Sequence, residues 1–219
     1  MISRPATAAT AALFALAVAP AAEAEDTYAD YADLAAHETE GVDYRRAVRD
    51  GSTDVVHIAI HGGGIERPTT ELADRAAASG DHGFGTFEGI KPSGNSVLHI
   101  TSTHFDEPRI SDAVAGSPYT VSWHGAAGDE PTTYVGGLDT ELRDAVREEL
   151  REVGFDAPDA LPDGLTGEDP DNIANRNTRG KGVQLELTRA QRDVLVKDGV
   201  PTAEFDDYVA AVERAVSRR

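Results

Sequence analysis

One stretch decides the fold class: Val55-Val-His-Ile-Ala-Ile-His61-Gly-Gly-Gly-Ile-Glu66-Arg-Pro68. Its first six residues are mostly apolar and β-branched, a pattern that predicts a buried strand. Three glycines then interrupt the run, and Pro68 is typical of the first turn of a helix. Open α/β sheets place their binding sites where a strand ends in such a turn. His61 and Glu66 flank the turn, and both are residue types that bind metal ions.

Predicted strands and helices alternate along the rest of the chain. Strands are expected at 44–49, 55–60, 84–90, 97–101, 119–124, 132–135 and 183–187, and helices at 28–37, 68–79, 106–115, 138–153, 189–196 and 203–216. The segment 155–177 is rich in Pro, Gly and Asp and predicts a long loop, which is often functional. This order predicts an α/β fold with a single mixed, largely parallel twisted sheet and helices on both faces.

The first 24 residues differ in composition from the rest. Arg4 precedes an apolar run from Ala8 to Ala19, and Pro-Ala-Ala-Glu-Ala follows and ends at Ala24. This pattern predicts a secretory signal peptide at 1–24, and the run is too short for a stable membrane anchor. Cleavage after Ala24 would leave 25–219 as a single catalytic domain outside the cell. A membrane anchor or an Ala-rich helix is the alternative.

Composition restricts the chemistry and the partners. The 219 residues include no cysteine, so a metal site must use His, Asp and Glu. There are 39 acidic and 20 basic residues, and the net charge is −19. Such a charge keeps a protein soluble and opposes binding to nucleic acid. We therefore expect a monomer that has no nucleic-acid partner.

Two histidines and one glutamate meet the ligand requirement of a catalytic zinc site. Such a site has three protein ligands and one open position for water. His61 and Glu66 come from the strand-to-helix turn, and His124 ends another predicted strand. One zinc ion there would lower the pKa of its water and polarise a carbonyl. A structural hydrogen bond at each histidine is the alternative reading.

Glu186 is the best candidate for the base that takes a proton from the attacking water. It lies between Leu185 and Leu187 on a predicted buried strand. Carboxylates are seldom buried without a partner or a role. An outward-facing acid on an edge strand is the alternative.

Polar residues also gather in and after the long loop: Asn172, Asn175, Arg176, Asn177 and Arg179. A guanidinium makes a bidentate contact with a carboxylate, so Asn175, Arg176 and Arg179 are candidate substrate-binding residues. Alternatively, these side chains satisfy turn backbones and surface acids.

His104 and Asp106 form a further candidate pair, which would support the metal site or add a ligand. Capping of the next helix by Asp106 would explain part of this pair. The histidines expected in packing or structural hydrogen bonds are His57, His82 and His99.

Five motifs together carry a family resemblance: His61-Gly-Gly-Gly-Ile-Glu66, Ile100-Thr-Ser-Thr-His-Phe-Asp-Glu-Pro108, Trp123-His-Gly125, Asn172-Ile-Ala-Asn-Arg176 and Gly182-Val-Gln-Leu-Glu-Leu187. In this order the chain resembles the poly-γ-glutamate hydrolase family of phage enzymes and bacterial relatives, from about Tyr31 to Val196. The resemblance implies a zinc carboxypeptidase-like phosphorylase/hydrolase fold. It also implies one zinc ion on His61, Glu66 and His124, with Glu186 as the base. By the same resemblance, Asn175 and Arg176 would hold a substrate carboxylate, although carboxypeptidases place their Asn-Arg before the last His.

Three functions are compatible with these features. The first is a secreted zinc hydrolase that cleaves γ-glutamyl amide bonds of poly-γ-glutamate. The second keeps the metal and acts on a peptide or an N-acyl amino acid. The third is a non-catalytic extracellular module that binds metal or polymer. Nucleotide hydrolysis is excluded because the glycines lack the Lys and Ser/Thr of a P-loop, and no Gly-x-Ser-x-Gly nucleophile elbow is present.

Overall fold

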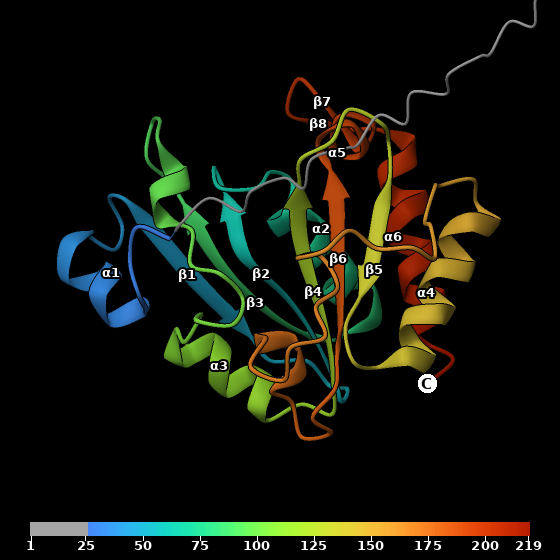
Figure 1. Cartoon of the computed structure of the whole chain (residues 1–219), viewed down its shortest axis with the longest axis horizontal. Coiled ribbons are helices and arrows are strands. Elements are labelled where there is room, and N and C mark those ends of the chain that lie inside the picture. The colour runs from blue at the N-terminus through green and yellow to red at the C-terminus, as the bar shows by residue number, and fades with distance from the viewer. Residues whose placement is uncertain (1–25) are drawn as a thin grey trace, which may run out of the picture.

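The computed structural model describes residues 26–219 and contains a mixed six-stranded sheet (Figure 1). The strands, in the order β1-β3-β2-β4-β6-β5 across the sheet, are β1 (Tyr44–Arg49), β3 (Gly83–Gly89), β2 (Val55–Gly63), β4 (Tyr119–Ala126), β6 (Val183–Thr188) and β5 (Thr133–Gly136). The four central strands are parallel, and β1 and β5 are antiparallel edges. The prediction of a mixed, largely parallel sheet is confirmed. The predicted signal peptide lies outside the described residues.

Helices cover both faces of the sheet, as predicted. One face packs against α2 (Thr69–Gly80), α4 (Thr140–Glu152), α5 (Arg189–Leu195) and α6 (Ala203–Val216), around buried Trp123 and Tyr208. The other packs against α1 (Tyr31–His37), α3 (Pro108–Ala115) and the 3₁₀ turns η1 (Asn95–Leu98) and η2 (Ile173–Asn175). A short hairpin, β7 (Val196–Lys197) and β8 (Val200–Pro201), joins α5 to α6. Among the described residues, no helix is long and apolar enough to cross a membrane.

The segment 97–101 is not the strand that its sequence predicted. Leu98 and Ile100 are buried and His99 is only partly buried, so the alternation of apolar residues is real. It arises because Leu98 and Ile100 point into the core beneath α1 and α3, while the backbone forms the 3₁₀ turn η1. Within residues 26–219 this segment joins neither sheet.

The strand order reverses direction at one place in the sheet, between β2 and β4. The chain passes from β2 through α2 to β3 on one side, and from β3 through α3 to β4 on the other side of β2. The two helices lie on opposite faces, so the carboxyl ends of β2 and β4 form a topological switch point. Pairing between β2 and β4 stops at Ile58 and Ser122, and both strands continue beyond it. Side chains that follow these two residues can therefore meet.

Candidate metal centre

The turn after β2 brings His61 and Glu66 together. The Glu66 backbone N–H donates to the carbonyl of His61 at 2.9 Å, which closes the turn. His61 Nδ1 then lies 3.2 Å from Glu66 Oε2. The glycines inside the turn are closely packed against neighbouring side chains. A Cβ on Gly62 would lie 2.1 Å from Thr70 Oγ1, and one on Gly64 would lie 2.4 Å from Asn95 Nδ2.

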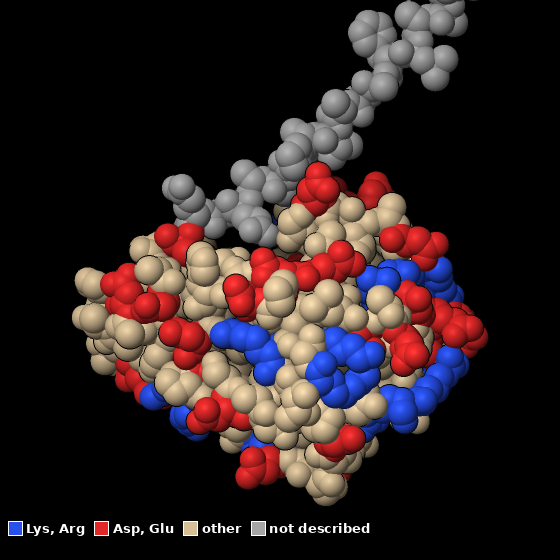
Figure 2. Space-filling model, turned by 60° about the horizontal axis from the view of Figure 1, so that its bottom comes forward, with Lys and Arg blue, Asp and Glu red and all other residues tan. Residues whose placement is uncertain are grey.

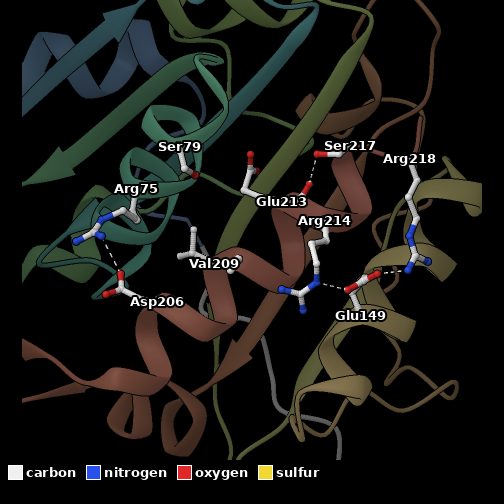
Figure 3. A pocket seen from close by; sticks show the side chains of 10 residues that line it. Arg75, Ser79, Glu149, Asp206, Val209, Glu213, Arg214, Ser217 and Arg218 are labelled. Carbon is white, nitrogen blue, oxygen red and sulfur yellow. Dashed lines mark hydrogen bonds and ion pairs between the residues drawn. The ribbon is translucent and has the colours of Figure 1, made fainter.

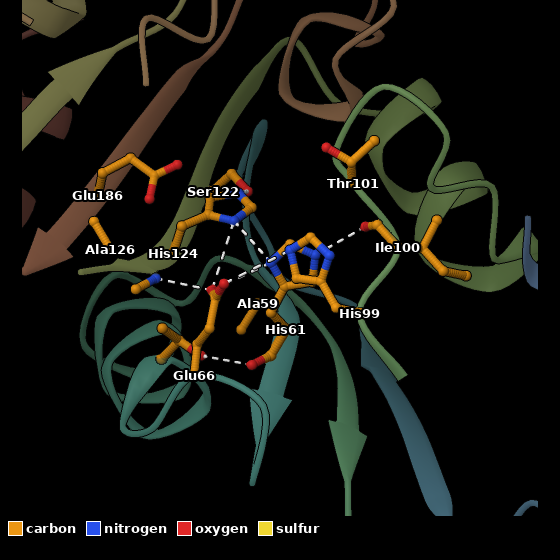
Figure 4. Close-up of polar contacts among 12 residues, drawn as sticks. Ala59, His61, Glu66, His99, Ile100, Thr101, Ser122, His124, Ala126 and Glu186 are labelled. Carbon is orange, nitrogen blue, oxygen red and sulfur yellow. Dashed lines mark hydrogen bonds and ion pairs between the residues drawn. The ribbon is translucent and has the colours of Figure 1, made fainter. Parts of the chain in front are cut away.

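His124 reaches the same point from β4, beyond the end of the β2–β4 pairing. Its Nδ1 lies 3.2 Å from His61 Nδ1 and 3.9 Å from Glu66 Oε2. Figure 4 shows the two imidazoles and the carboxylate pointing toward one another. The three residues predicted as ligands therefore converge, although His124 is 58 positions after Glu66 in the chain (124 − 66).

The outer hydrogen bonds leave the two Nδ1 atoms available as acceptors. His61 Nε2 lies 2.9 Å from the carbonyl of Ile100, which can only accept, so Nε2 carries the proton. His124 Nε2 lies 2.7 Å from Ser122 Oγ, and we assign its proton there in the same way. Metal-binding histidines commonly donate their other N–H to such a partner, which fixes the ring. Ser122 and the Ile100 carbonyl therefore support the two histidines. Ser122 acts through its side chain and lies two residues before His124, so its role could have been inferred from the sequence, whereas that of a backbone carbonyl could not.

The electrostatics keep Glu66 ionised and His124 neutral. Burial raises the pKa of Glu66, but His61 and His124 and the Gly125 N–H, which donates to Oε2 at 2.8 Å, lower it to about 2. Burial and the neighbouring His61 lower the pKa of His124 to about 3. Burial would also lower the pKa of His61, but the facing carboxylate raises it. A carboxylate and a neutral imidazole are the forms in which these residues bind metals.

The donor set fits a zinc ion. Zinc binds His nitrogen and carboxylate oxygen at about 2.0 to 2.2 Å, so two tetrahedral ligands lie roughly 3.3 to 3.6 Å apart. The triangle of His61 Nδ1, His124 Nδ1 and Glu66 Oε2 has sides of 3.2, 3.2 and 3.9 Å. Each side is within a few tenths of an ångström of that range. These three residues could hold one zinc ion and leave a fourth position open.

His99 is the functional neighbour that the sequence did not reveal. Its ring stacks on His61 with 3.9 Å between centroids, and its Nε2 lies 3.9 Å from Glu66 Oε1. His61, Glu66 and His99 therefore form an alternative ligand set. We favour His124, because its Nδ1 lies 3.2 Å from His61 Nδ1, whereas the stacked rings of His61 and His99 direct their lone pairs along similar planes. Asp26 fixes this region, accepting from His99 Nδ1 at 2.8 Å and from the Thr101 N–H at 2.7 Å.

Glu186 lies beside His124, as the candidate base should. The two residues are register partners on the neighbouring parallel strands β4 and β6, so their side chains extend from the same face. Glu186 is 8% exposed and accepts a hydrogen bond from Gln184 Nε2 at 3.1 Å. Figure 4 shows its carboxylate on the His124 side of the three converging groups. The alternative of an outward-facing acid on an edge strand is wrong, because β6 lies between β4 and β5.

The loop residues separate into different environments. Asn175 is buried and holds the loop: its Oδ1 accepts from Leu138 and Gly182, and its Nδ2 donates to Gly167 and Asp169. Its polar atoms are therefore committed to backbone partners. It holds the loop and has no group left for a substrate.

Arg179 lies far from the ligand triangle. Its Nη1 donates to Asp139 at 2.6 Å and its guanidinium stacks on Tyr119, the first residue of β4. His124 is five residues further along that strand, roughly 16 Å away. We therefore leave Arg179 out of the proposed site.

Arg176 keeps an unused donor. Its Nη2 donates to the carbonyl of Phe105, in the segment that follows His99 and Ile100. Its buried Nε has no hydrogen-bond partner within residues 26–219. Burial lowers its pKa, which the nearby Asp106 and Asp171 oppose. An incompletely paired guanidinium suits an incoming carboxylate.

His104 and Asp106 do not contact the ligand triangle. His104 is exposed, with its Nδ1 3.9 Å from Asp26 Oδ2. Asp106 is exposed and accepts from the Tyr31 N–H at the start of α1. The cap of α3 is Glu107, which accepts from the N–H groups of Arg109 and Ile110. The carboxylate that supports the site is Asp26 instead, 78 positions before His104 (104 − 26).

A second His–Glu–His cluster lies at the other end of the central strands, where Glu213 borders a cavity between α2 and α6 (Figure 3). Glu213 Oε1 lies 3.1 Å from His57 Nε2, and Oε2 lies 3.0 Å from His82 Nε2. Trp123 Nε1 donates to His57 Nδ1 at 3.2 Å. An indole can only donate, so the proton of neutral His57 is on Nε2, which lies near Glu213 Oε1 without forming an aligned hydrogen bond. This arrangement favours an ion–dipole cluster and opposes a metal.

Comparison with known proteins gives one family for nearly the whole described chain. The family model of poly-gamma-glutamate hydrolase matches residues 28–211. The YndL protein of Bacillus subtilis (strain 168) is 40% identical over 154 residues, which are 70% of this chain and 60% of YndL. The prophage-derived YoqZ protein of that strain is 35% identical over 184 residues, 80% of this chain and 66% of YoqZ. The chain thus spans less than two thirds of the length of these relatives.

Solved structures agree with the fold. A bacteriophage poly-gamma-glutamate hydrolase superposes with a TM-score of 0.85 at 40% identity, over 88% of this chain and 97% of that one. A zinc-free apo structure of YndL gives a TM-score of 0.82 at 34% identity, over 88% of this chain and 98% of that one.

Proposed function

This chain belongs to the poly-gamma-glutamate hydrolase family, and on that premise we propose that it is a secreted, monomeric, zinc-dependent hydrolase that cleaves γ-glutamyl amide bonds of poly-γ-glutamate. The observation that carries the proposal is the triangle of His61, Glu66 and His124 beside Glu186. The zinc-free form of a related structure, YndL, supports the choice of metal. The leader pattern at 1–24 supports export.

The donor set defines what a metal would contribute. A zinc ion held by the three residues would polarise the scissile carbonyl and lower the pKa of a water molecule. Glu66 supplies a carboxylate whose charge is kept by His61, His124 and the Gly125 N–H. Ile100 and Ser122 keep the two imidazoles turned with Nδ1 inward.

The protein then supplies the proton transfers. Glu186, next to His124 on the neighbouring strand, takes the proton of the attacking water and passes it to the leaving amine. Gln184 donates to one carboxylate oxygen of Glu186 and holds that side chain in place. Arg176, which is only partly buried, binds an α-carboxylate of the polymer through its guanidinium.

Substrate cleavage and metal content test the proposal separately. Purified protein is incubated with poly-γ-glutamate, with and without a chelator, and chain length is followed by gel filtration. We expect shortening that stops with the chelator and returns with zinc. If the polymer keeps its length with zinc added, the substrate assignment is wrong, and a panel of peptides and N-acyl amino acids identifies the alternative hydrolase. Zinc content of wild type and His124→Ala tests the ligand set: zinc retained in the variant removes His124 from it.

A further inference from the structure

Arg192 lies against the outer side of the metal centre and has no role in the function proposed above. It belongs to α5, which begins directly after β6, the strand of Glu186. Its Nη1 donates to the carbonyl of Arg67 at 2.7 Å, and its Nη2 donates to the carbonyl of Ala126 at 3.2 Å. Arg67 follows Glu66, and Ala126 is two residues after His124. One guanidinium therefore joins the two segments that carry these ligands.

The Arg192 guanidinium packs directly against the backbone of Gly125. A Cβ on Gly125 would lie 2.8 Å from Arg192 Cζ, 2.9 Å from its Nε and 3.0 Å from its Nη1. The three nearest atoms all belong to Arg192, and the backbone of Gly125 is outside the left-handed region. A side chain at this position would therefore displace the Arg192 guanidinium. The N–H of the same residue donates to Glu66 Oε2 at 2.8 Å.

The charge of Arg192 also acts on the site. Burial lowers its pKa, and the carboxylates of Glu66 and Glu186 are among the charges that oppose this effect. Its Nε is buried with no hydrogen-bond partner in the described part of the chain. A planar guanidinium can span two carbonyls in one plane, whereas an ammonium presents a single point charge.

We propose that Arg192 is a positioning residue, a clamp that holds the Glu66 turn against the end of β4 so that Glu66 and His124 stay at ligand distance. This inference rests on the proposed role of those two residues as ligands. Loss of the clamp would let the two segments separate. The sides of the ligand triangle that join Glu66 to the histidines would then lengthen, and zinc affinity would fall.

A double-mutant cycle between Gly125→Ala and Arg192→Ala tests the clamp. Zinc dissociation constants are measured by competition with a chromogenic chelator. We expect each single variant to weaken zinc binding by about 10-fold or more, as changes around metal ligands do. In the Arg192→Ala background, Gly125→Ala should add less than about 2-fold, because the obstructing side chain is gone. Arg192→Lys, which keeps the charge but not the fork, should bind zinc about as weakly as Arg192→Ala.

The matched control is Arg189→Gln, an exposed arginine on the same helix, which should leave the zinc dissociation constant unchanged. Independent effects of the two substitutions in the cycle would overturn the proposal, as would full zinc affinity in Arg192→Ala.

The same cycle is repeated on thermal unfolding without zinc. Gly125→Ala should lower Tm by roughly 3 to 10 °C in the wild type and by less than about 2 °C without Arg192. If wild type binds no zinc, the proposed function fails. The coupling in Tm then still decides whether the clamp exists.

Discussion

Glu213→Gln should destabilise the protein by an amount that depends on pH. Glu213 lies on α6 and its two oxygens face His57 on β2 and His82 next to β3, so it joins the helix to the sheet. Burial raises its pKa, but the two histidines outweigh this effect and lower the pKa from 4.5 to about 2. The side chain is only 13% exposed, so water screens these contacts little.

The magnitude follows from linkage. A carboxyl whose pKa falls from 4.5 to about 2 on folding contributes about 3 kcal/mol of stability at neutral pH. His57 Nε2 and Glu213 Oε1 are 3.1 Å apart but are not aligned as a hydrogen bond. We therefore expect about 2 to 3 kcal/mol for the substitution. Because the folded pKa is the lower one, the contribution is complete above the unfolded pKa of 4.5. It is lost as pH falls toward 2, with about 1 kcal/mol left at pH 3.

Urea unfolding followed by circular dichroism between pH 3 and 7.5 measures the difference in free energy of unfolding between wild type and variant. Burial lowers the pKa of His57 and Glu213 partly opposes this, so protonation of His57 also removes stability in acid, and it removes more in the variant than in the wild type. Asp207→Asn, an exposed acid on the same helix, is the matched control and should change the free energy by less than about 0.5 kcal/mol. A difference that stays constant across the pH range would refute the reasoning.

Three further predictions concern the site. Glu186→Gln should lower kcat by at least about 100-fold with its zinc content unchanged, because only the proton transfer is lost; activity near wild type would exclude Glu186 as the base. Asp26→Ala removes the acceptor of His99 and Thr101, and should raise the zinc dissociation constant by roughly 10-fold in the same chelator competition. An unchanged constant would show that the segment keeps its place without Asp26. With poly-γ-glutamate as substrate, kcat/KM should rise as sodium chloride increases from about 0.05 to 0.5 M, since salt screens the repulsion between an acidic protein and a polyanion.

The sequence predicted the parts of the fold that depend on local periodicity. The apolar run before His61 became β2, and the amphipathic segment 138–153 became α4 at Thr140–Glu152. It failed at 97–101, because alternating burial of Leu98 and Ile100 occurs there without a partner strand. Periodicity reports which side chains enter the core. Strand pairing depends on which backbone lies next to them, and no residue in the segment itself specifies that.

The convergence of the proposed ligands was predictable for a related reason, whereas the groups proposed to support them were not. His61 and His124 each lie near the carboxyl end of a predicted parallel strand, and such ends meet at one edge. Ile100 acts through its carbonyl, Asp26 through a contact 73 positions away, and Arg192 through two backbone carbonyls. None of these roles leaves a local pattern in the sequence. Arg179 shows the opposite error. It is close to Arg176 in the chain, which suggested that both bind substrate, but its guanidinium packs on Tyr119 and pairs with Asp139, away from the ligand triangle.

The net charge of −19 and a polyanionic substrate are compatible if local charge differs from total charge. On the face seen in Figure 2, acidic side chains are scattered, and Lys and Arg gather in a few patches among them. Charges further apart than about 8 Å are largely screened at physiological salt, so distant acids slow the approach of the polymer more than they weaken its binding. Arg176, the proposed substrate contact, and Arg192, beside the proposed metal ligands, are partly buried guanidinium groups, each with an Nε that has no hydrogen-bond partner in the described chain. Partly buried charges are screened much less. Under the proposed function, the acidic surface would therefore act mainly on the association rate, while Arg176 would act on the bound polymer and Arg192 on the metal ligands.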